Sequence, residues 1–310
     1  RNFVNKIWNA SRLTFALLDN VGSAAEAGPS SFLPDKWIRS RCRKVAREVA
    51  EAIDTYRYSD AAHLLYNFVW HEFCDWYLEL VKPVLYGKVV DGDRAATGKV
   101  LRSTFSDILA LLHPFMPFVT EELYQRMPSR SHESIMIAPF PRGDEGEADE
   151  ESERRMDVIM GVIDVIRNIR GEMAVAPNVK VDVLVRANGE RDLIESYAYF
   201  IKELARVEVL AFTDTKPERA AMGIYKEIEI FVPIKDPEVI VRELARVEKE
   251  LTKMEAEIAR SGKKLQNRDF REKAPAEVIR KEEATYDELL SKREKLMANR
   301  SRLEAILGTK

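Results

Sequence analysis

The chain has 310 residues, of which 45% are hydrophobic and 33% charged, so it can bury substantial cores and should divide into two or three domains. This composition excludes a disordered chain and a fibrous repeat. No stretch approaches the roughly 18 consecutive apolar residues of a membrane helix, and the start, RNFVNKIWNA, is neither a signal peptide nor a plausible translation start. We therefore expect a cytoplasmic protein without a membrane partner, present here as part of a longer chain.

Charge is unevenly distributed along the sequence. The formal net charge is −3, yet residues 238–310 carry 18 Lys and Arg against 15 Asp and Glu, and the remaining residues carry 31 against 37. This asymmetry favours a nucleic-acid partner without establishing one. Cys42 and Cys74 lie far apart on apolar helix faces, which predicts core packing and excludes a disulfide framework or a four-cysteine zinc site.

Residues 1–138 predict a bundle of about five helices. Apolar residues recur at helical spacing from Trp37 to Ile53, with Asp35 placed to cap the start of that helix. The aromatic-rich stretch HLLYNFVWHEFCDWYLELVK predicts a helix that is buried on more than one face. Pro114 and Pro117 must break the next helical run, because proline lacks an amide donor and clashes with the preceding turn.

Residues 139–153, PFPRGDEGEADEESE, hold seven acids, two prolines and two glycines, and they predict a solvated acidic linker. A small α+β domain is expected to follow over residues 154–237. Its first helix should bury one apolar face, formed by Met156, Ile159, Ile163 and Ile166.

The rest of this domain alternates between strand and helix signals. Residues 179–186 and 224–232 alternate like strands, residues 193–204 look helical, and Asn188-Gly189 marks a turn. We expect a three-stranded sheet that carries helices on one face.

Residues 238–310 predict an antiparallel coiled-coil hairpin, roughly 35 to 50 Å long. Apolar residues from Ile240 to Ile258 follow a heptad repeat that ends at Gly262. The returning helix begins at Pro275, a residue favoured at a first helical position, and it repeats leucine every seven residues. The predicted fold class is mainly α, with a helical bundle, a small α+β domain and a C-terminal coiled-coil hairpin.

We find no catalytic constellation in the sequence. There is no glycine-rich phosphate loop, no metal-spaced cluster and no nucleophile motif of the GxSxG kind. The four histidines are scattered, which is typical of helix-surface or core residues. No catalytic residue and no metal ligand is predicted.

Amides and a guanidinium share one face of the first helix. Asn2, Asn5, Asn9 and Arg12 follow one another at steps of three, four and three residues. Such side chains read exposed base edges, and Phe32 in the following loop could stack on an unpaired base. The alternative is a capped, solvated helix face.

The next helix carries six cations between Lys36 and Arg47 with no acid among them. Arg39, Arg43 and Arg47 share one face, which suits a phosphate backbone. An ordinary solvated surface is the alternative.

The tip of the hairpin is basic and partly apolar. Its cations are Lys263, Lys264, Arg268, Arg271 and Lys273, which outnumber Asp269 and Glu272. Leu265 and Phe270 could close the end of the hairpin, or they could present an apolar platform, ringed by cations, to a base pair or loop. Both can hold if one residue orders the tip and the other binds.

Several stretches together resemble the C-terminal portion of class I aminoacyl-tRNA synthetases, and the valyl enzymes most closely. RNFVNKIWNASR, DKWIRSRC, FVWHEFCDWYLELVKP and LLHPFMPFVTEELYQ look like helices of their anticodon-binding bundle, and SIMIAPFP with VIRNIRGEMAVAP resembles the junction beyond it. KLQNRDFREKAPAEVIRKE is similar to the tip of the coiled-coil arm of valyl-tRNA synthetases. The resemblance covers nearly the whole chain, in order.

The resemblance implies a tRNA-binding portion that does not itself charge tRNA, since the HIGH and KMSKS signatures are missing. It implies valine tRNA isoacceptors and the enzyme's N-terminal catalytic domain as partners, with a monomer expected. Asn5, Asn9, Arg12 and Phe32 would meet the anticodon, whose informative bases are A and C, and the arm tip would meet the tRNA elbow. No cofactor is expected in this portion, although the parent enzyme would use ATP with magnesium.

Two alternatives remain open at the level of sequence. The same region could belong to an isoleucyl or leucyl enzyme, although isoleucyl enzymes usually end in a cysteine-ligated zinc module that two cysteines cannot supply. The chain could instead be a non-catalytic coiled-coil interaction protein. Arg293 and Arg300 at seam positions weaken that idea, because charges there disfavour a long dry interface.

Overall fold

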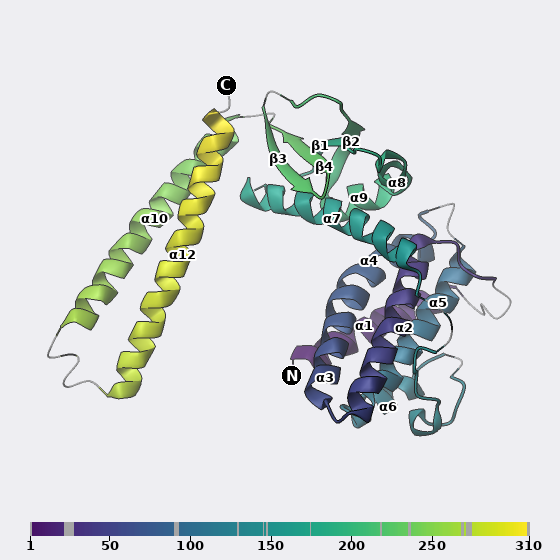
Figure 1. The fold of residues 1–310 in the computed structure, drawn as a ribbon. Coiled ribbons are helices and arrows are strands. Elements are labelled where there is room, and N and C mark those ends of the chain that lie inside the picture. Colours follow the sequence, from purple (N-terminus) through teal and green to yellow (C-terminus); the bar gives the residue numbers. More distant parts are fainter. Residues whose placement is uncertain are drawn as a thin grey trace. The chain divides into compact units, whose positions relative to one another are not determined.

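The computed structural model describes residues 2–21, 28–89, 93–128, 130–144, 146, 148–173, 175–217, 219–234, 237–267, 270 and 275–308. The chain divides into two compact units, Arg1–Val158 and Ile159–Lys310. Helix dominates both, and the sheet is small (Figure 1), which confirms the predicted mainly α class. No helix in these ranges is long and apolar enough to cross a membrane. The finer domain boundaries stay predictions.

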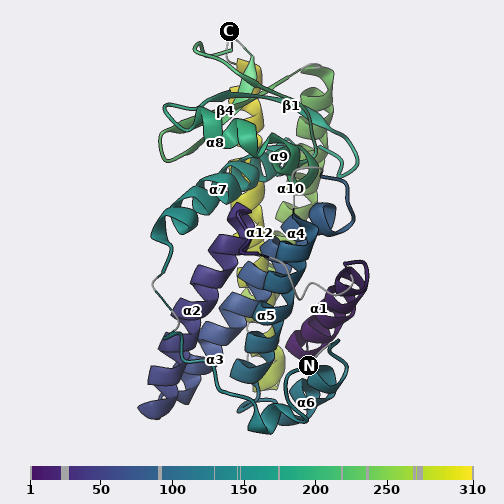
Figure 2. The same ribbon diagram turned by 90° about the vertical axis from the view of Figure 1, so that its right-hand side faces the viewer.

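The first unit is a helical bundle whose rods pack around a continuous apolar core. Its elements are α1 (Asn2–Asp19), α2 (Leu33–Asp54), α3 (Tyr58–Asn67), the π-helix η1 (Phe68–Tyr77), α4 (Leu78–Leu85), α5 (Arg94–Leu112), α6 (Pro117–Gln125) and the 3₁₀ turn η2 (Ile135–Ile137). Because α3, η1 and α4 follow one another without a break, they form one continuous helical segment. The described part of the bundle then has five helical segments, in agreement with the prediction of about five helices. Figure 2 shows α2 and α5 side by side.

The aromatic-rich rod is buried on more than one face, as predicted. Phe73 and Tyr77 of η1 and Leu78, Leu80 and Val81 of α4 are at most 2% exposed, and Leu78 and Leu80 lie on opposite sides of α4. The break expected at the two prolines is also confirmed, since α5 ends at Leu112 and α6 begins at Pro117.

Asp35 does not cap α2, and that prediction is wrong. The residue that precedes the helix is Phe32, whereas Asp35 is completely buried within the first turn. Its carboxylate accepts hydrogen bonds from the hydroxyls of Ser30 (2.6 Å), Tyr77 (2.7 Å) and Thr97 (2.7 Å). The side chain therefore joins the loop before α2 to η1 and α5, a role that a sequence pattern for caps cannot reveal.

The acidic segment after the bundle is packed on α2 rather than solvated along its whole length. Gly143 has a φ of 71° and lies so close to α2 that a Cβ there would overlap the carbonyl oxygen of Arg43. Arg47 donates a hydrogen bond to the carbonyl of Gly143 (3.1 Å), and Arg142 pairs with Asp54 (3.2 Å). Residues 150–153 already belong to helix α7 (Glu150–Glu172), so the helix begins inside the predicted linker.

The second unit contains a four-stranded sheet, and the expectation of three strands is wrong. Its elements are β1 (Val181–Arg186), α8 (Arg191–Ser196), α9 (Ala198–Ala205), β2 (Val207–Phe212), β3 (Ala220–Tyr225) and β4 (Ile228–Pro233). The strand order is β2-β1-β4-β3, with β1 and β2 parallel and the other pairs antiparallel.

The chain reverses direction within residues 224–232, which were expected to form one strand. Lys226 adopts a φ of 52°, and β3 and β4 pair directly on either side of it. Apolar alternation continues across so short a turn, so periodicity alone does not show it. The turn predicted at Asn188-Gly189 is confirmed, because both residues have positive φ.

Helix α7 covers one face of the sheet (Figure 1). A Cβ at Gly223 of β3 would overlap Val165, and a Cβ at Gly161 of α7 would overlap the ring of Tyr225. The apolar face predicted for this helix is buried, since Met156, Ile159, Ile163 and Ile166 are all 0% exposed.

The antiparallel hairpin consists of α10 (Pro237–Gln266) and α12 (Ala276–Gly308), which run side by side (Figure 1). Val247 and Leu303 of the predicted seam are completely buried, in agreement with the heptad pattern. Gly262 does not end the first helix, which continues to Gln266. A Cβ at Gly262 would come 3.3 Å from the ring of Tyr286, so glycine allows the two helices to approach closely here.

Candidate nucleic-acid interface

The polar face predicted on the first helix lies on the surface of α1. Asn5, Asn9 and Arg12 are exposed, while Ile7 and Leu17 on the other side are at most 1% exposed. None of the three polar side chains makes a side-chain hydrogen bond or ion pair within the described part of the chain. Their donors and acceptors are therefore available to a ligand.

An aromatic cluster that the sequence reasoning missed adjoins this face. Phe3 of α1 lies 5.1 Å from Tyr66 and 6.3 Å from Trp70 between ring centroids, and Tyr66 and Trp70 are stacked 5.4 Å apart. Lys6 lies over Trp70 and pairs with Asp75 at 2.7 Å. The spacing of Tyr66 and Trp70, one helical turn apart, was the available sequence signal.

Phe32 is only half-buried and stands where the loop meets α2. Its amide donates to the hydroxyl of Ser30 (3.2 Å), and Ser30 in turn donates to the buried Asp35. The backbone that carries the ring is thus anchored, while part of the ring remains accessible.

The cations of α2 divide into two groups. Arg41 donates two hydrogen bonds to the carboxylate of Glu72 in a bidentate pair (2.7 and 2.9 Å), and Lys44 forms an ion pair with Glu153 at 2.8 Å. The hydrogen bond to Glu72 raises the pKa of the Arg41 guanidinium. These two cations hold the bundle and the start of α7 together, whereas the remaining cations lie on a neighbouring face of α2.

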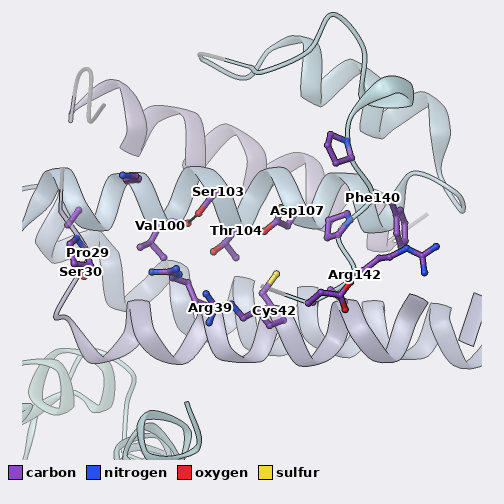
Figure 3. Close-up of a pocket in the computed structure, with 18 of the residues that line it drawn as sticks. Pro29, Ser30, Arg39, Cys42, Val100, Ser103, Thr104, Asp107, Phe140 and Arg142 are labelled. Atoms are coloured by element: carbon purple, nitrogen blue, oxygen red, sulfur yellow. Dashed lines mark hydrogen bonds between the residues drawn. The ribbon is translucent and has the colours of Figure 1, made fainter. Parts of the chain in front are cut away.

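That neighbouring face carries the arginines predicted to bind phosphate, and the structure brings two of them into one cavity. Arg39 is exposed and Arg43 half-buried, and both line a cavity of about 820 Å³ between α2, α5 and residues 139–144. Figure 3 shows Arg39 and Cys42 of α2 facing the α5 residues, with Pro29 and Ser30 at one end and Phe140 and Arg142 at the other. Arg47 lies outside this lining, bonded to Gly143.

The arm tip is partly described. Lys263 is exposed, and Leu265 and Phe270 are half-buried. Lys264 lies 5.0 Å from the centroid of the Phe270 ring and pairs with Glu282 at 2.7 Å. The other predicted tip cations lie outside the described residues: Arg268, Arg271 and Lys273.

Glu282 is the acid at the tip that sequence reasoning overlooked. It also accepts a hydrogen bond from the hydroxyl of Ser261 (2.8 Å), and the hydrogen bond from Lys264 lowers its pKa. Because α10 and α12 are antiparallel, Glu282 meets residues that precede it by 18 and 21 positions, a proximity that helix spacing does not predict.

In the part of the chain that the structure describes, no group of three or more His, Cys, Asp or Glu side chains could hold a metal ion. Both cysteines are free and buried, and burial raises the pKa of both thiols, that of Cys74 to about 12. The predicted core-packing role of the cysteines is therefore confirmed.

Two family profiles match the chain in order. Residues 35–185 match the family described as the anticodon-binding domain of tRNA ligase, and residues 240–304 match the family described as the valyl tRNA synthetase tRNA binding arm.

Curated relatives are similar to the chain along most of its sequence, and they are valine–tRNA ligases. The chain is 39% identical to the valine–tRNA ligase of Geobacter sulfurreducens over 99% of its own length and 35% of that protein. It is 40% identical to the Carboxydothermus hydrogenoformans ligase over 91% of its own length and 32% of that protein. It is 36% identical to the Symbiobacterium thermophilum ligase over 99% of its own length and 36% of that protein. The chain thus spans about a third of the length of these relatives.

Proposed function

The chain belongs to the valyl-tRNA synthetase family, and we propose that it binds the anticodon stem-loop and the elbow of valine tRNA for that enzyme. The observation that carries the proposal is the order of the two family matches, which span a bundle and a coiled-coil arm with predicted contact residues on both. Activation of valine with ATP and magnesium, and transfer to the tRNA, would be carried out by a catalytic portion that this chain does not contain.

The bundle supplies the anticodon-reading surface in this proposal. Asn5 and Asn9 would offer amide donors and acceptors to base edges, and Arg12 would contact a base or a phosphate. Exposure of all three side chains on α1 supports these roles. Phe32 is a further stacking candidate, since part of its ring is accessible.

The arm supplies the elbow-binding surface. Lys263 and Lys264, with Arg268, Arg271 and Lys273, would neutralise phosphates, while Leu265 or Phe270 would meet an exposed outer base pair. The match of residues 240–304 to a valyl arm supports a valine enzyme over an isoleucyl or leucyl one, and over a coiled-coil protein that only assembles with itself. We further propose a monomer and recognition of valine isoacceptors.

Titration of the chain with valine tRNA at increasing salt tests this function. We expect the logarithm of the affinity to fall linearly with the logarithm of the salt concentration, because phosphate contacts release counterions. Replacing the A or C of the anticodon should weaken binding, by about 1–3 kcal/mol for each lost base contact. Salt-insensitive binding, or equal binding to any tRNA, would contradict the proposal.

A further inference from the structure

The cavity between α2 and α5 has a floor of small or compact side chains. Cys42 and Ala46 of α2 and Ala96 and Val100 of α5 line it, and each is at most 7% exposed. Short side chains at neighbouring positions of two packed helices leave a trough between them, because no long residue fills the groove. The volume of about 820 Å³ lies in the usual range of ligand sites, roughly 300 to 1,000 Å³.

Cations surround the apolar floor. Arg39 and Arg43 come from α2, Lys99 from α5 and Arg142 from the segment that follows the bundle, against the acids Asp107 and Asp144. The guanidinium of Arg43 also lies beside Gly146. Arg142 also pairs with Asp54, so the excess of positive charge over these two acids comes from Arg39, Arg43 and Lys99. Such an excess favours an anionic ligand, and arginine and lysine are common phosphate-binding residues.

The cavity also offers groups that a bare anion does not need. Ser103 and Thr104 of α5 and the carboxylate of Asp107 line the same wall, and Phe140 closes one end (Figure 3). A carboxylate repels a polyphosphate but accepts hydrogen bonds from a ribose hydroxyl or a base amino group. An aromatic ring gives a base a stacking surface. Together these groups match a nucleoside monophosphate.

The charged row continues past the cavity along α2. Lys36, one turn before Arg39, and Arg47, one turn after Arg43, are both exposed. Flanking cations suit a nucleotide whose 5′ and 3′ neighbours also carry phosphates, which favours a nucleotide within an RNA chain over a free one.

We propose that this cavity takes one unpaired nucleotide of the bound tRNA, with its phosphate on Arg39, Arg43 and Lys99 and its base against Phe140. This inference rests on the proposed tRNA-binding function and adds a contact site on α2 and α5 to those on α1 and the arm. Phe140, Lys99 and Asp107 are residues that neither the sequence reasoning nor the family resemblance assigns to tRNA.

Two matched substitutions distinguish a specific contribution of the cavity to tRNA affinity from the effect of positive charge elsewhere on the surface. Lys99→Gln removes a cation from the cavity, and Lys88→Gln removes another exposed lysine that does not line it. We expect Lys99→Gln to lower the affinity for valine tRNA about five- to tenfold and Lys88→Gln to change it less than about twofold. If the unsubstituted chain binds tRNA and both variants lose the same factor, the cavity proposal is wrong while the proposed function stands.

Amide NMR shifts of Ser103 and Thr104 identify the ligand chemistry. Uridine 5′-monophosphate should shift them at concentrations at least about tenfold below inorganic phosphate, and Phe140→Leu should abolish that preference. Excess valine tRNA should displace the mononucleotide. Equal shifts with phosphate would mean that the cavity binds only an anion, and failure of displacement would mean a free-nucleotide site; either result overturns the proposal. Absence of any tRNA binding by the unsubstituted chain would instead refute the function on which it rests.

Discussion

Asp35 shows how one side chain can hold the bundle in place. Its carboxylate is completely buried and accepts three hydroxyl hydrogen bonds, from the loop before α2, from η1 and from α5. Burial raises its pKa, and the hydrogen bonds from Ser30, Thr97 and Tyr77 oppose this effect. The same neighbourhood raises the pKa of the Tyr77 phenol, again mainly through burial.

Asp35→Asn should destabilise the bundle by about 1–3 kcal/mol at pH 7, because an amide nitrogen cannot accept from the hydroxyls that surround it. The folded-state pKa of Asp35 is raised, so its contribution to the free energy of unfolding is greatest below its unfolded pKa and declines as pH rises through the folded pKa. The stability difference between the original chain and Asp35→Asn should therefore grow as pH falls from 7. Urea unfolding at several pH values measures it.

The exposed Asp19 of α1 provides the control for this prediction. Asp19→Asn should leave the free energy of unfolding within about 0.5 kcal/mol at each pH, as surface substitutions usually do. A difference for Asp35→Asn that shrinks on acidification would contradict the assigned direction of its pKa.

At the scale of elements, ion pairs within the protein decide which cations remain for RNA. On α2, Glu72 and Glu153 engage Arg41 and Lys44 and leave Arg39 exposed. On the arm, Glu282 engages Lys264 and so competes with a phosphate for it. Intramolecular pairing thus sets the strength of a basic surface as much as the number of cations does.

Glu282→Gln should strengthen tRNA binding about twofold to fivefold at low salt, because Lys264 becomes free to contact a phosphate. The slope of log affinity against log salt should steepen by roughly 0.9 for one added phosphate contact. Fluorescence anisotropy with labelled valine tRNA at several salt concentrations provides both values.

Glu288→Gln is the matched control, since Glu288 pairs with Lys292 one turn away on the same helix, α12. This variant should leave both affinity and slope nearly unchanged. If Glu282→Gln weakens binding, the pair with Lys264 orders the tip, and the competition described here is wrong.

At the scale of the whole molecule, the proposed anticodon and elbow contacts lie on separate compact units. Substitutions on one should therefore act independently of those on the other. Arg12→Ala should reduce discrimination between valine tRNA and a tRNA with a replaced anticodon base. Lys263→Gln combined with Lys264→Gln should weaken binding to both tRNAs by the same factor.

The combined variant tests this independence. Its loss in binding free energy should equal the sum of the separate losses to within about 0.5 kcal/mol. Equilibrium titration of all four proteins with both tRNAs provides the comparison. Loss of anticodon preference in the tip variant would show that the tip also reads the anticodon, against the proposed division of roles.

Local patterns in the sequence were sufficient to predict much of the architecture. Helical and heptad periodicity predicted the bundle, the helix over Met156 to Ile166 and the coiled-coil arm, because burial of one face imposes its spacing on the sequence. Amides on α1 and cations on α2 also follow from spacing along a single helix, and the basic tip follows from local composition.

Contacts between distant residues were decided only by the tertiary structure. The core position of Asp35, the hairpin around Lys226, the packing of Gly143 on α2 and the pairing of Lys264 with Glu282 all depend on approach between segments that spacing along one element cannot encode. The cavity between α2 and α5 is of the same kind, since small residues predict a trough only once their helices are known to be neighbours. Periodicity encodes which face of an element is buried, whereas the partner of that face is set by packing.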